Sequence, residues 1–206
     1  MTIQISSVNT LIIYFEERIC EEVLDQVQRA YRLLKDIEGI IDITPSYHSL
    51  LIEYDIGLYD YKSIQKQIRH HLAKQNPNHK DKKGKLIKIP TLYSEAVGID
   101  LARVAKLNAL TIQEVIEIHT QTIYRVYAIG FMLGFAYLAK VDKQIVTPRL
   151  ATPRAKVPKG SIAIAEHQTA IYPKDSAGGW NIIGQTKFDD FTQFEVGDSV
   201  QFVSIG

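Results

Sequence analysis

The sequence predicts an α+β protein built as two domains, a small sandwich of strands and helices followed by a β-barrel. Strand-like runs flank two amphipathic helical patterns before residue 76. A polar, lysine-rich stretch over 76–85 then interrupts the apolar pattern, and short strand-like runs with glycine- and proline-rich turns dominate beyond Thr122. We therefore expect domains over residues 1–84 and 85–206. The lysine-rich stretch is interpreted as a solvated linker, with a phosphate or partner patch as the alternative.

The strands and helices of the first domain follow a ferredoxin-like order. Strand-like patterns cover residues 3–5, 10–15, 40–44 and 47–54. Between the second and third of these runs, apolar residues recur at spacings of three and four, which is typical of one helix face, and Gly39 ends that helix. A turn at Pro45-Ser46 is expected to join the last two strands, and Asp60 is expected to cap a second helix. Strands flanking two helices in this way indicate a ferredoxin-like sandwich.

The second domain is predicted to begin with a strand and two short helices and to continue as a barrel. Residues 86–90 form the strand pattern, and Asp100 is a candidate N-cap for the first helix. Thr111 and Glu114 form a T-x-x-E capping box for the second helix. Later strand-like runs cover residues 123–129, 161–165, 169–172, 180–183 and 199–204. Many short strands at this spacing are typical of a closed or nearly closed β-barrel.

Composition and charge restrict the classes of function. Among 206 residues, 46% are apolar and 23% are charged, which is ordinary for a globular protein and excludes a disordered chain. The formal net charge is +1, which argues against a surface built to bind nucleic acid or an anionic membrane. The longest uncharged run, residues 126–139, is shorter than the ~20 residues that a membrane-spanning helix needs. Because the sequence starts without a secretory signal, we expect a cytoplasmic protein.

Common catalytic and metal-binding signatures are absent from the sequence. It has no phosphate-binding loop, no dinucleotide fingerprint, no nucleophile elbow and no H-E-x-x-H zinc motif. A single cysteine also excludes any multi-cysteine metal site. We therefore expect this chain to hold no metal ion of its own.

The residues best suited to bind a substrate lie between 149 and 172. Two Pro-Arg steps end at Arg149 and Arg154. Proline stiffens each loop, and the planar guanidinium suits a carboxylate or a phosphate. Further along the chain, Gln168, Thr169 and Tyr172 offer neutral donors and acceptors that suit an amide or a urea-like group. The two arginines fit either a grip on an anionic substrate or ordinary surface positions, and both interpretations stay open.

Two further residues and a glycine pair each have two open interpretations. Trp180, the sole tryptophan, follows a Gly-Gly turn and fits either the wall of a binding site or an anchor of the core. His119, just after the capped helix, fits either an acid or base near neutral pH or a histidine favoured by the helix dipole. Gly130 and Gly134 fit either a ligand-lined turn or a tightly packed barrel corner.

Four motifs occur in an order that closely resembles the KipI / allophanate hydrolase subunit 1 family. Residues 130–138 read Gly-Phe-Met-Leu-Gly-Phe-Ala-Tyr-Leu, and both Pro-Arg steps follow them. Residues 168–173 read Gln-Thr-Ala-Ile-Tyr-Pro, and residues 178–184 read Gly-Gly-Trp-Asn-Ile-Ile-Gly. The sequence departs from the family pattern at Leu133 and Ala177, where proline is usual, and these changes are expected to loosen two loops.

The resemblance implies a small α+β N-terminal domain and a cyclophilin-like β-barrel C-terminal domain of carboxyltransferase type. It also implies a hetero-oligomeric enzyme that is inactive as a single chain, because the family includes one of the subunits of the bacterial ATP-dependent 5-oxoprolinase. The implied partners are a subunit 2 (KipA-like) protein and a LamB/YcsF-like protein, and the implied reaction opens the lactam of 5-oxo-L-proline to give L-glutamate. ATP with magnesium is expected to act at the level of the complex.

Within such an enzyme, roles are assigned to the candidate residues. The expected catalytic residues are His119 and Arg154, and the expected substrate-binding residues are Arg149, Gln168, Thr169, Tyr172 and Trp180. Two alternatives stay open. KipI itself inhibits a sporulation histidine kinase, so a histidine kinase is an alternative partner. Related domains occur in urea carboxylase, so allophanate or a urea derivative is an alternative substrate.

Overall fold

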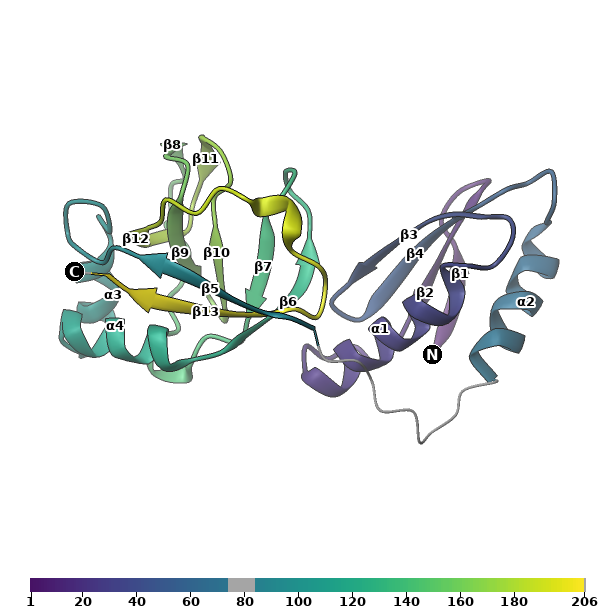
Figure 1. Cartoon of the computed structure of the whole chain (residues 1–206), viewed down its shortest axis with the longest axis horizontal. Helices are drawn as coiled ribbons and strands as arrows, with labels where there is room; N and C mark the ends of the chain where they lie inside the picture. Colours follow the sequence, from purple (N-terminus) through teal and green to yellow (C-terminus); the bar gives the residue numbers. More distant parts are fainter. Residues whose placement is uncertain (74–83, 206) are drawn as a thin grey trace. The chain divides into compact units, whose positions relative to one another are not determined.

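The chain divides into two compact units between residues 83 and 84 (Figure 1). The computed structural model describes residues 1–73 and 84–205, so most of the predicted linker at 76–85 lies outside the described residues. Each unit has its own buried apolar core. Within the described ranges, no helix is long and apolar enough to cross a membrane.

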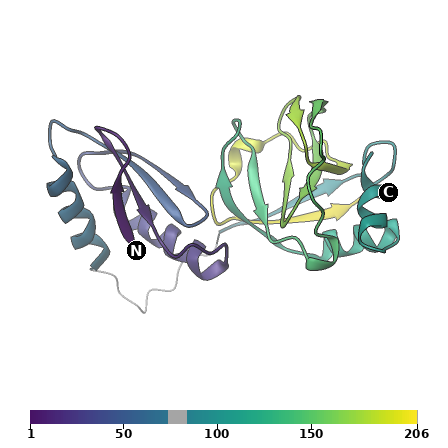
Figure 2. The ribbon, with the colours of Figure 1, turned by 180° about the vertical axis from the view of Figure 1, so that it is seen from behind.

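The first unit is an antiparallel sheet with both of its helices on one face (Figures 1 and 2). Its elements are β1 (Thr2–Ile5), β2 (Thr10–Tyr14), α1 (Glu21–Leu34), β3 (Ile40–Ser46), β4 (Ser49–Tyr54) and α2 (Tyr61–Ala73). Within residues 1–73 the sheet has four strands in the order β1-β2-β4-β3. From β2 onward the chain runs strand, helix, hairpin, helix, as in a ferredoxin-like unit. β1 takes the sheet position that the final strand holds in the usual order, and the ferredoxin-like prediction is otherwise confirmed.

Alternation along the strands gives this sheet one apolar face. Leu11 and Ile13 on β2, and Leu50 and Ile52 on β4, are fully buried in the same cluster as the apolar faces of the helices. The helices contribute Val27, Ala30, Leu34, Ile64, Ile68 and Leu72 to this cluster. The three- and four-residue spacing that predicted the two helices is therefore the spacing of their buried side chains.

The hairpin between β3 and β4 differs from the sequence prediction. The predicted turn at residues 45–46 is wrong, because both residues belong to β3 and the turn lies at 47–48. Pro45 is tolerated within a strand because β3 is an edge strand of this sheet, where one side of the backbone has no ladder partner. The predicted cap of α2 is confirmed, since Oδ1 of Asp60 accepts a hydrogen bond of 2.7 Å from the backbone N–H of Ser63.

The second unit is a nearly closed β-barrel with a small ribbon beside it (Figures 1 and 2). Its elements are β5 (Leu86–Thr91), α3 (Leu101–Leu107), α4 (Ile112–Gln121), β6 (Tyr124–Ile129), β7 (Ala136–Ala139), η1 (Lys143–Ile145), β8 (Arg154–Val157), β9 (Ser161–Ala165), β10 (Gln168–Ile171), β11 (Ser176–Gly178), β12 (Asn181–Gln185), η2 (Phe191–Gln193) and β13 (Ser199–Ser204). Within residues 84–205 the main sheet has seven strands in the order β12-β9-β10-β7-β6-β13-β5, and β8 pairs with β11 in the separate ribbon.

One backbone bridge joins the two ends of this sheet. The N–H of Leu92 donates to the carbonyl of Gln185 at 2.8 Å, and the N–H of Gln185 donates to the carbonyl of Leu92 at 3.0 Å. Leu92 directly follows β5, and Gln185 ends β12, so the bridge forms the seam of the barrel. The barrel predicted from the many short strands is confirmed.

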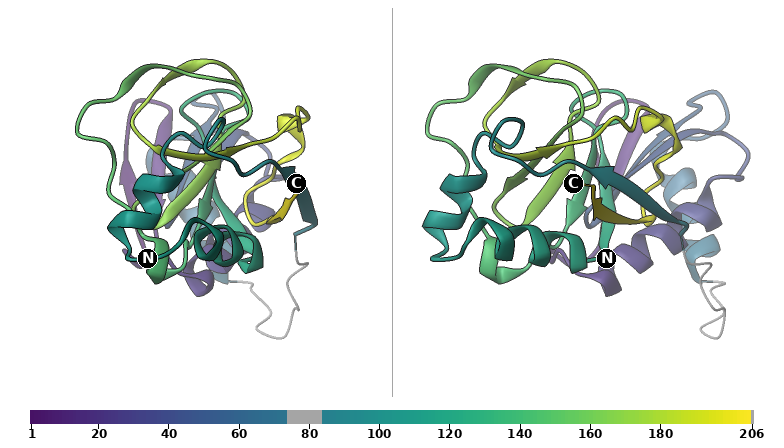
Figure 3. Two further views of the ribbon diagram at one scale, coloured as in Figure 1. Left: turned by 90° about the vertical axis from the view of Figure 1, so that its left-hand side faces the viewer. Right: turned by 60° about the vertical axis from the view of Figure 1, so that its left-hand side comes forward.

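The two helices of this unit pack side by side, α3 against β12 and α4 against β13 (Figure 3). The predicted capping box of α4 is confirmed. Thr111 Oγ1 accepts from the backbone N–H of Glu114 at 3.2 Å, and the Glu114 carboxylate accepts from the backbone N–H of Thr111 at 2.7 Å. The predicted side-chain cap of α3 is wrong, because the carboxylate of Asp100 has other partners than the helix N-terminus.

The glycine pair at 130 and 134 forms the turn between β6 and β7. Gly134 has a φ of 81°, and a Cβ atom there would lie 2.6 Å from the Cβ atom of Phe191. Both the left-handed backbone and the close approach therefore require glycine. This packing supports the barrel-corner interpretation of the motif. It also explains why β7 was not predicted, since its four residues directly follow a stretch with the composition of a turn.

The strands β9, β10 and β12 bear apolar side chains on both faces of the sheet. The face toward the barrel core carries Ile162, Ile164, Ile171 and Ile183. On the other side lies a second cluster, called here the outer cluster, made of Phe135, Val157, Ala163, Ala165, Ala170, Tyr172, Trp180 and Ile182. Its alanines leave room for the aromatic rings, and Val157 links it to the β8–β11 ribbon.

Candidate functional site

The loop that carries both Pro-Arg steps is held against the turn that precedes β12. The backbone N–H of Leu150 donates to the carbonyl of Gly179 at 2.8 Å. Four residues later β8 begins at Arg154, which lies opposite Gly178 in the β8–β11 ribbon. Arg149 and Arg154 therefore stand at the two ends of one loop, beside the same turn.

Arg149 lies over the ring of Trp180. Its Cζ atom is 5.7 Å from the ring centroid, which is within cation–π range. Trp180 is 5% exposed, and it packs against Phe135 and Tyr137 with ring centroids 5.8 and 6.0 Å away. Trp180 is thus an anchor of the outer cluster on one side and a support for Arg149 on the other. Its role in substrate binding stays a prediction.

Tyr172 lies in the outer cluster directly beneath Gly178. A Cβ atom on Gly178 would lie 2.4 Å from the Tyr172 hydroxyl oxygen, so the backbone approaches the phenol as closely as glycine allows. Burial raises the pKa of Tyr172, while a backbone hydrogen bond from Trp180 and the charges of Arg149 and Arg154 act in the opposite direction. The phenol is therefore a neutral hydroxyl near pH 7, with both guanidinium groups in its electrostatic neighbourhood.

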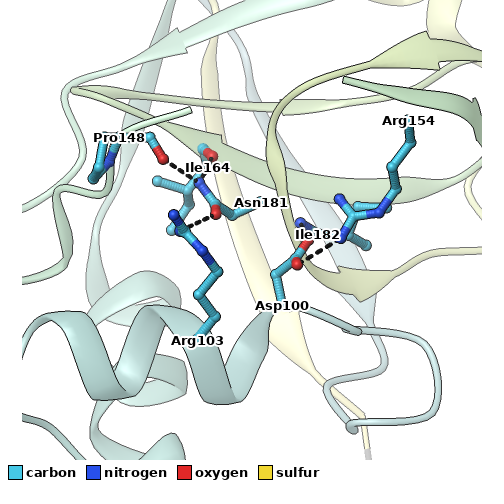
Figure 4. A network of polar contacts seen from close by, with 7 residues as sticks. All are labelled: Asp100, Arg103, Pro148, Arg154, Ile164, Asn181 and Ile182. Atoms are coloured by element: carbon cyan, nitrogen blue, oxygen red, sulfur yellow. Dashed lines mark hydrogen bonds and ion pairs between the residues drawn. The ribbon is translucent and has the colours of Figure 1, made fainter. Parts of the chain in front are cut away.

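Arg154 reaches from the ribbon to Asp100 at the start of α3 (Figure 4). Its Nη2 atom is 2.7 Å from Asp100 Oδ1, with the arginine side chain 28% exposed and the aspartate side chain 6% exposed. The second carboxylate oxygen of Asp100 accepts from the backbone N–H of Ile182 at 2.8 Å, and the Asp100 N–H donates to the Ile182 carbonyl at 2.9 Å. Asp100 therefore fixes Arg154 relative to β12. The other terminal nitrogen, Nη1, is buried without a hydrogen-bond partner among the described residues.

Asn181, the residue before Ile182 on β12, holds the start of the loop between Arg149 and Arg154, called here the arginine loop. Its Nδ2 donates to the carbonyls of Pro148 and Ile164 at 2.9 and 3.0 Å, and its Oδ1 accepts from Arg103 Nη1 at 2.6 Å (Figure 4). The side chain is fully buried, and these bonds satisfy both of its polar atoms. Asn181 therefore sets the backbone that immediately precedes Arg149.

His119 is separated from these residues. It lies in the last turn of α4 rather than after the helix, and it is fully buried. Its Nδ1 is 2.7 Å from the Tyr93 hydroxyl, its Nε2 is 3.0 Å from Thr169 Oγ1, and its ring stacks 4.6 Å from that of Phe202. Burial lowers the pKa of His119 to about 3, so the imidazole is neutral near pH 7. This placement gives the side chain no contact with solvent.

Strand alternation explains which predicted residues gather and which do not. Thr169 is fully buried on the core face of β10, where it contacts His119. Tyr172 is three residues along an extended chain, so it points to the other side, and Gln168 shares the side of Tyr172. The structure therefore brings Arg149, Arg154, Tyr172 and Trp180 together, places Gln168 on the same face, and leaves His119 and Thr169 in the core. The catalytic and binding roles given to all seven residues stay predictions.

Two residues that the sequence interpretation missed organise this region. Asn181 directly precedes two isoleucines, and a buried amide needs several partners, so this signal was present in the sequence. The partnership of Asp100 with Arg154 spans 54 positions of the chain and had no local signal. The arrangement offers two guanidinium groups, one neutral hydroxyl and an aromatic wall, which suit oxygen-rich anions and carbonyl groups. Within residues 1–73 and 84–205, no three His, Cys, Asp or Glu side chains are grouped to hold a metal ion.

Comparison with known proteins identifies the family. The carboxyltransferase domain family, subdomains C and D, matches residues 1–197. The 5-oxoprolinase B subunit of Bacillus subtilis (strain 168) is 34% identical, covering 96% of this chain and 90% of that protein. The 5-oxoprolinase B subunit of Haemophilus influenzae is 37% identical, covering 85% of this chain and 84% of that protein. These relatives confirm the resemblance found in the motifs.

Solved structures share the fold. The crystal structure of TTHA0988 matches with a TM-score of 0.84 at 29% identity and covers 97% of this chain, which spans 40% of that protein's length. The Kluyveromyces lactis urea carboxylase matches with a TM-score of 0.77 at 15% identity, and this chain spans 23% of it. The predicted combination of an α+β unit and a carboxyltransferase-type barrel is therefore confirmed. With a family match over nearly its whole length and relatives above 30% identity, the chain belongs to the carboxyltransferase subdomain C and D family.

Proposed function

We propose that this chain is a subunit of an ATP-dependent 5-oxoprolinase. The complex would convert 5-oxo-L-proline, ATP and water into L-glutamate, ADP and phosphate. The observation that carries the proposal is its similarity to two 5-oxoprolinase B subunits, at 34% and 37% identity over most of both chains. The geometry of the arginine loop supports it, because a lactam acid offers one carboxylate and one amide carbonyl to two guanidinium groups.

The chemistry needs stabilisation of negative charge on oxygen. A lactam carbonyl is unreactive toward water, and ATP supplies the phosphoryl group that activates its oxygen. In this chain, Arg149 and Arg154 are the groups that donate hydrogen bonds to oxygen atoms of the substrate. The neutral phenol of Tyr172 is 1% exposed beneath Gly178, so it acts by supporting the ribbon that carries Arg154, and the ring of Trp180 supports Arg149. The two arginines bind and orient the substrate rather than transfer a proton.

We propose that ATP and its magnesium ion act at the level of the complex. The sequence lacks a phosphate-binding loop, and the described residues hold no group of three metal-ligating side chains. The proposed partners are a subunit 2 (KipA-like) protein and a LamB/YcsF-like protein, and the complex is proposed to act in the cytoplasm. The substrate site at the arginine loop would then be completed by a partner surface.

The test is reconstitution of the whole complex. The chain is co-expressed with its subunit 2 and LamB/YcsF-like partners, and glutamate is measured from 5-oxoproline with and without ATP. Arg154→Ala is expected to lower kcat/KM by about 100-fold, the usual cost of losing one donor to a developing oxyanion. Lys156→Ala is the matched control, because Lys156 lies on the same strand with a 72% exposed side chain paired to Asp175.

Three results would contradict the proposal. If the complex makes no glutamate in the presence of ATP, the proposed 5-oxoprolinase reaction is excluded. Turnover of allophanate instead would support the alternative substrate. Full activity of Arg154→Ala would exclude the proposed substrate site but would leave the proposed reaction unaffected. Inhibition of a histidine kinase's autophosphorylation by the chain alone, without any 5-oxoprolinase activity, would support the regulatory alternative.

A further inference from the structure

The two arginines at the ends of the loop differ in electrostatic state. Arg149 is exposed and lies over Trp180, and among the described residues no carboxylate is paired with it. Arg154 is held by the nearly buried Asp100 at 2.7 Å, so its positive charge is already balanced. The first guanidinium therefore keeps its full attraction for an anion, whereas the second acts as part of a neutral pair.

One terminal nitrogen of Arg154 nevertheless makes no hydrogen bond to the described residues. Its Nη1 is buried and has no acceptor within the described part of the chain. A buried N–H without an acceptor is unfavourable, so an oxygen atom that reaches it gains the full strength of a desolvated hydrogen bond. Although Nη1 itself is buried, 28% of the Arg154 side chain is exposed, so the guanidinium lies at the surface of this region, where a bound molecule can approach it.

The nearby carboxylate decides which kind of oxygen fits there. A carboxylate bound to Nη1 would lie close to the carboxylate of Asp100, which is bound to Nη2 of the same planar group, and the like charges would repel. A carbonyl oxygen avoids that repulsion and still accepts a strong hydrogen bond from a charged donor. Asp100 thus converts an arginine that would bind anions into a donor for neutral groups.

We propose a division of labour, resting on the function proposed above: Arg149 binds the carboxylate of the substrate, and Arg154, positioned and neutralised by Asp100, donates Nη1–H to the lactam carbonyl oxygen. The two groups lie at opposite ends of one loop, and the hydroxyl of Tyr172 lies beneath Gly178, the ribbon partner of Arg154. The ligand class is therefore a molecule with one carboxylate and one neutral amide carbonyl. Asp100 is a positioning residue in this scheme.

The first experiment compares two substrates in the reconstituted complex, 5-oxoproline and its uncharged carboxamide, which has the same lactam. Arg149→Gln is expected to raise KM for 5-oxoproline by about 10- to 100-fold and to leave KM for the carboxamide unchanged. Asp100→Asn is expected to lower kcat for both substrates by the same factor while the ratio of their KM values stays at the wild-type level. Lys156→Gln is the control for a charge lost nearby. An equal effect of Arg149→Gln on both substrates would overturn the proposal, as would an Asp100→Asn effect confined to one of them.

A second measurement works with the purified chain and does not depend on turnover. Trp180 is the sole tryptophan and lies under Arg149, so its fluorescence reports on that guanidinium. Titration with 5-oxoproline is expected to change the emission, the carboxamide to change it far less, and Arg149→Gln to abolish the difference. If the complex fails to turn over 5-oxoproline but this carboxylate-specific signal persists, the proposed function fails and the assignment of Arg149 to the carboxylate stands. Equal responses to the two compounds, or no response from the chain either alone or within the reconstituted complex, overturn that assignment.

Discussion

At the scale of single residues, Gly178 and the phenol of Tyr172 leave no room for a side chain at position 178. The Tyr172 hydroxyl lies where the side chain of any other residue at 178 would begin. Gly179, the next residue, has nothing nearer than 3.5 Å around its own Cβ position. The two adjacent glycines of the family motif therefore differ. Gly178 leaves room for Tyr172, whereas position 179 has space for a methyl group.

We predict that Gly178→Ala destabilises the protein by about 1–3 kcal/mol, because the new methyl group would lie 2.4 Å from the hydroxyl oxygen of Tyr172, a side chain that is 1% exposed. Gly179→Ala is the matched control and is expected to be nearly neutral. Urea unfolding monitored by Trp180 fluorescence measures both. Equal stability of the two variants would show that Tyr172 is free to shift.

His119 makes stability depend on acidity. Its pKa is about 3 in the folded protein against 6.5 for an ordinary histidine, so between these values the unfolded chain binds a proton that the folded chain does not. Stability is therefore complete above about pH 6.5 and falls by ~1.4 kcal/mol per pH unit as the pH drops toward 3. His119→Gln, which does not titrate, is expected to show a shallower loss of stability between about pH 6 and 4.

The measurement is the free energy of unfolding against pH for wild type and variant. His70→Gln serves as the control, because His70 is exposed on α2. The test compares how steeply the free energy of unfolding changes with pH, not its absolute value. The absolute value also falls because the variant loses the hydrogen bonds to Tyr93 and Thr169. An unchanged slope in His119→Gln would mean that the imidazole is protonated in the folded protein.

At the scale of elements, the barrel is completed by a very short contact. The other neighbouring strands of the sheet meet along named ladders, whereas β5 and β12 meet through two hydrogen bonds between Leu92 and Gln185. The same stretch contains Gly184, where an added Cβ would lie 2.9 Å from the Leu92 carbonyl oxygen, so the two chains come close. The seam is the place where a small change has the largest effect on closure.

Leu92→Pro is expected to destabilise the second unit by roughly 3 kcal/mol, because proline removes the N–H that donates to Gln185 and leaves a carbonyl without its partner. Leu92→Ala keeps that donor and removes a side chain that is 39% exposed, so it is expected to cost less than about 1 kcal/mol. Thermal unfolding of both variants, together with hydrogen exchange of the Gln185 amide that both retain, would measure the effects. Similar losses in the two variants would show that the side chain, not the bridge, closes the barrel.

At the scale of the whole molecule, the sequence was most informative where a pattern was local. Helical spacing, the capping box at Thr111 and the cap at Asp60 depend on residues a few positions apart, and all three were predicted. The ribbon of β8 and β11 was not, because its two short strands are adjacent only after the chain between them has folded as β9 and β10. The position of β1 in the first sheet was equally a property of the assembled unit.

In the candidate site, too, local motifs were predicted from the sequence and contacts between distant residues were not. Pro-Arg steps and the Gly-Gly-Trp motif pointed to Arg149, Arg154 and Trp180, which the structure gathers around one loop. His119 and Thr169 were grouped with them by residue type, yet strand alternation turns Thr169 to the core, where His119 meets it. The chemical type of a residue does not tell which side of a strand it occupies. The pairing of Arg154 with Asp100, 54 positions away, produces no periodic pattern in the sequence.

The strand order also dictates when each unit becomes complete during synthesis. Because β1 precedes β2, every strand of the first sheet has emerged before α2, and the unit can fold as soon as that helix leaves the ribosome. The barrel has the opposite arrangement, since β13 inserts between β5 and β6, more than a hundred positions after β5 begins. Until β13 arrives, β5 and β6 present unpaired edges to the solvent. We therefore expect the second unit to complete its fold later than the first, because its non-local strand pairing waits for β13.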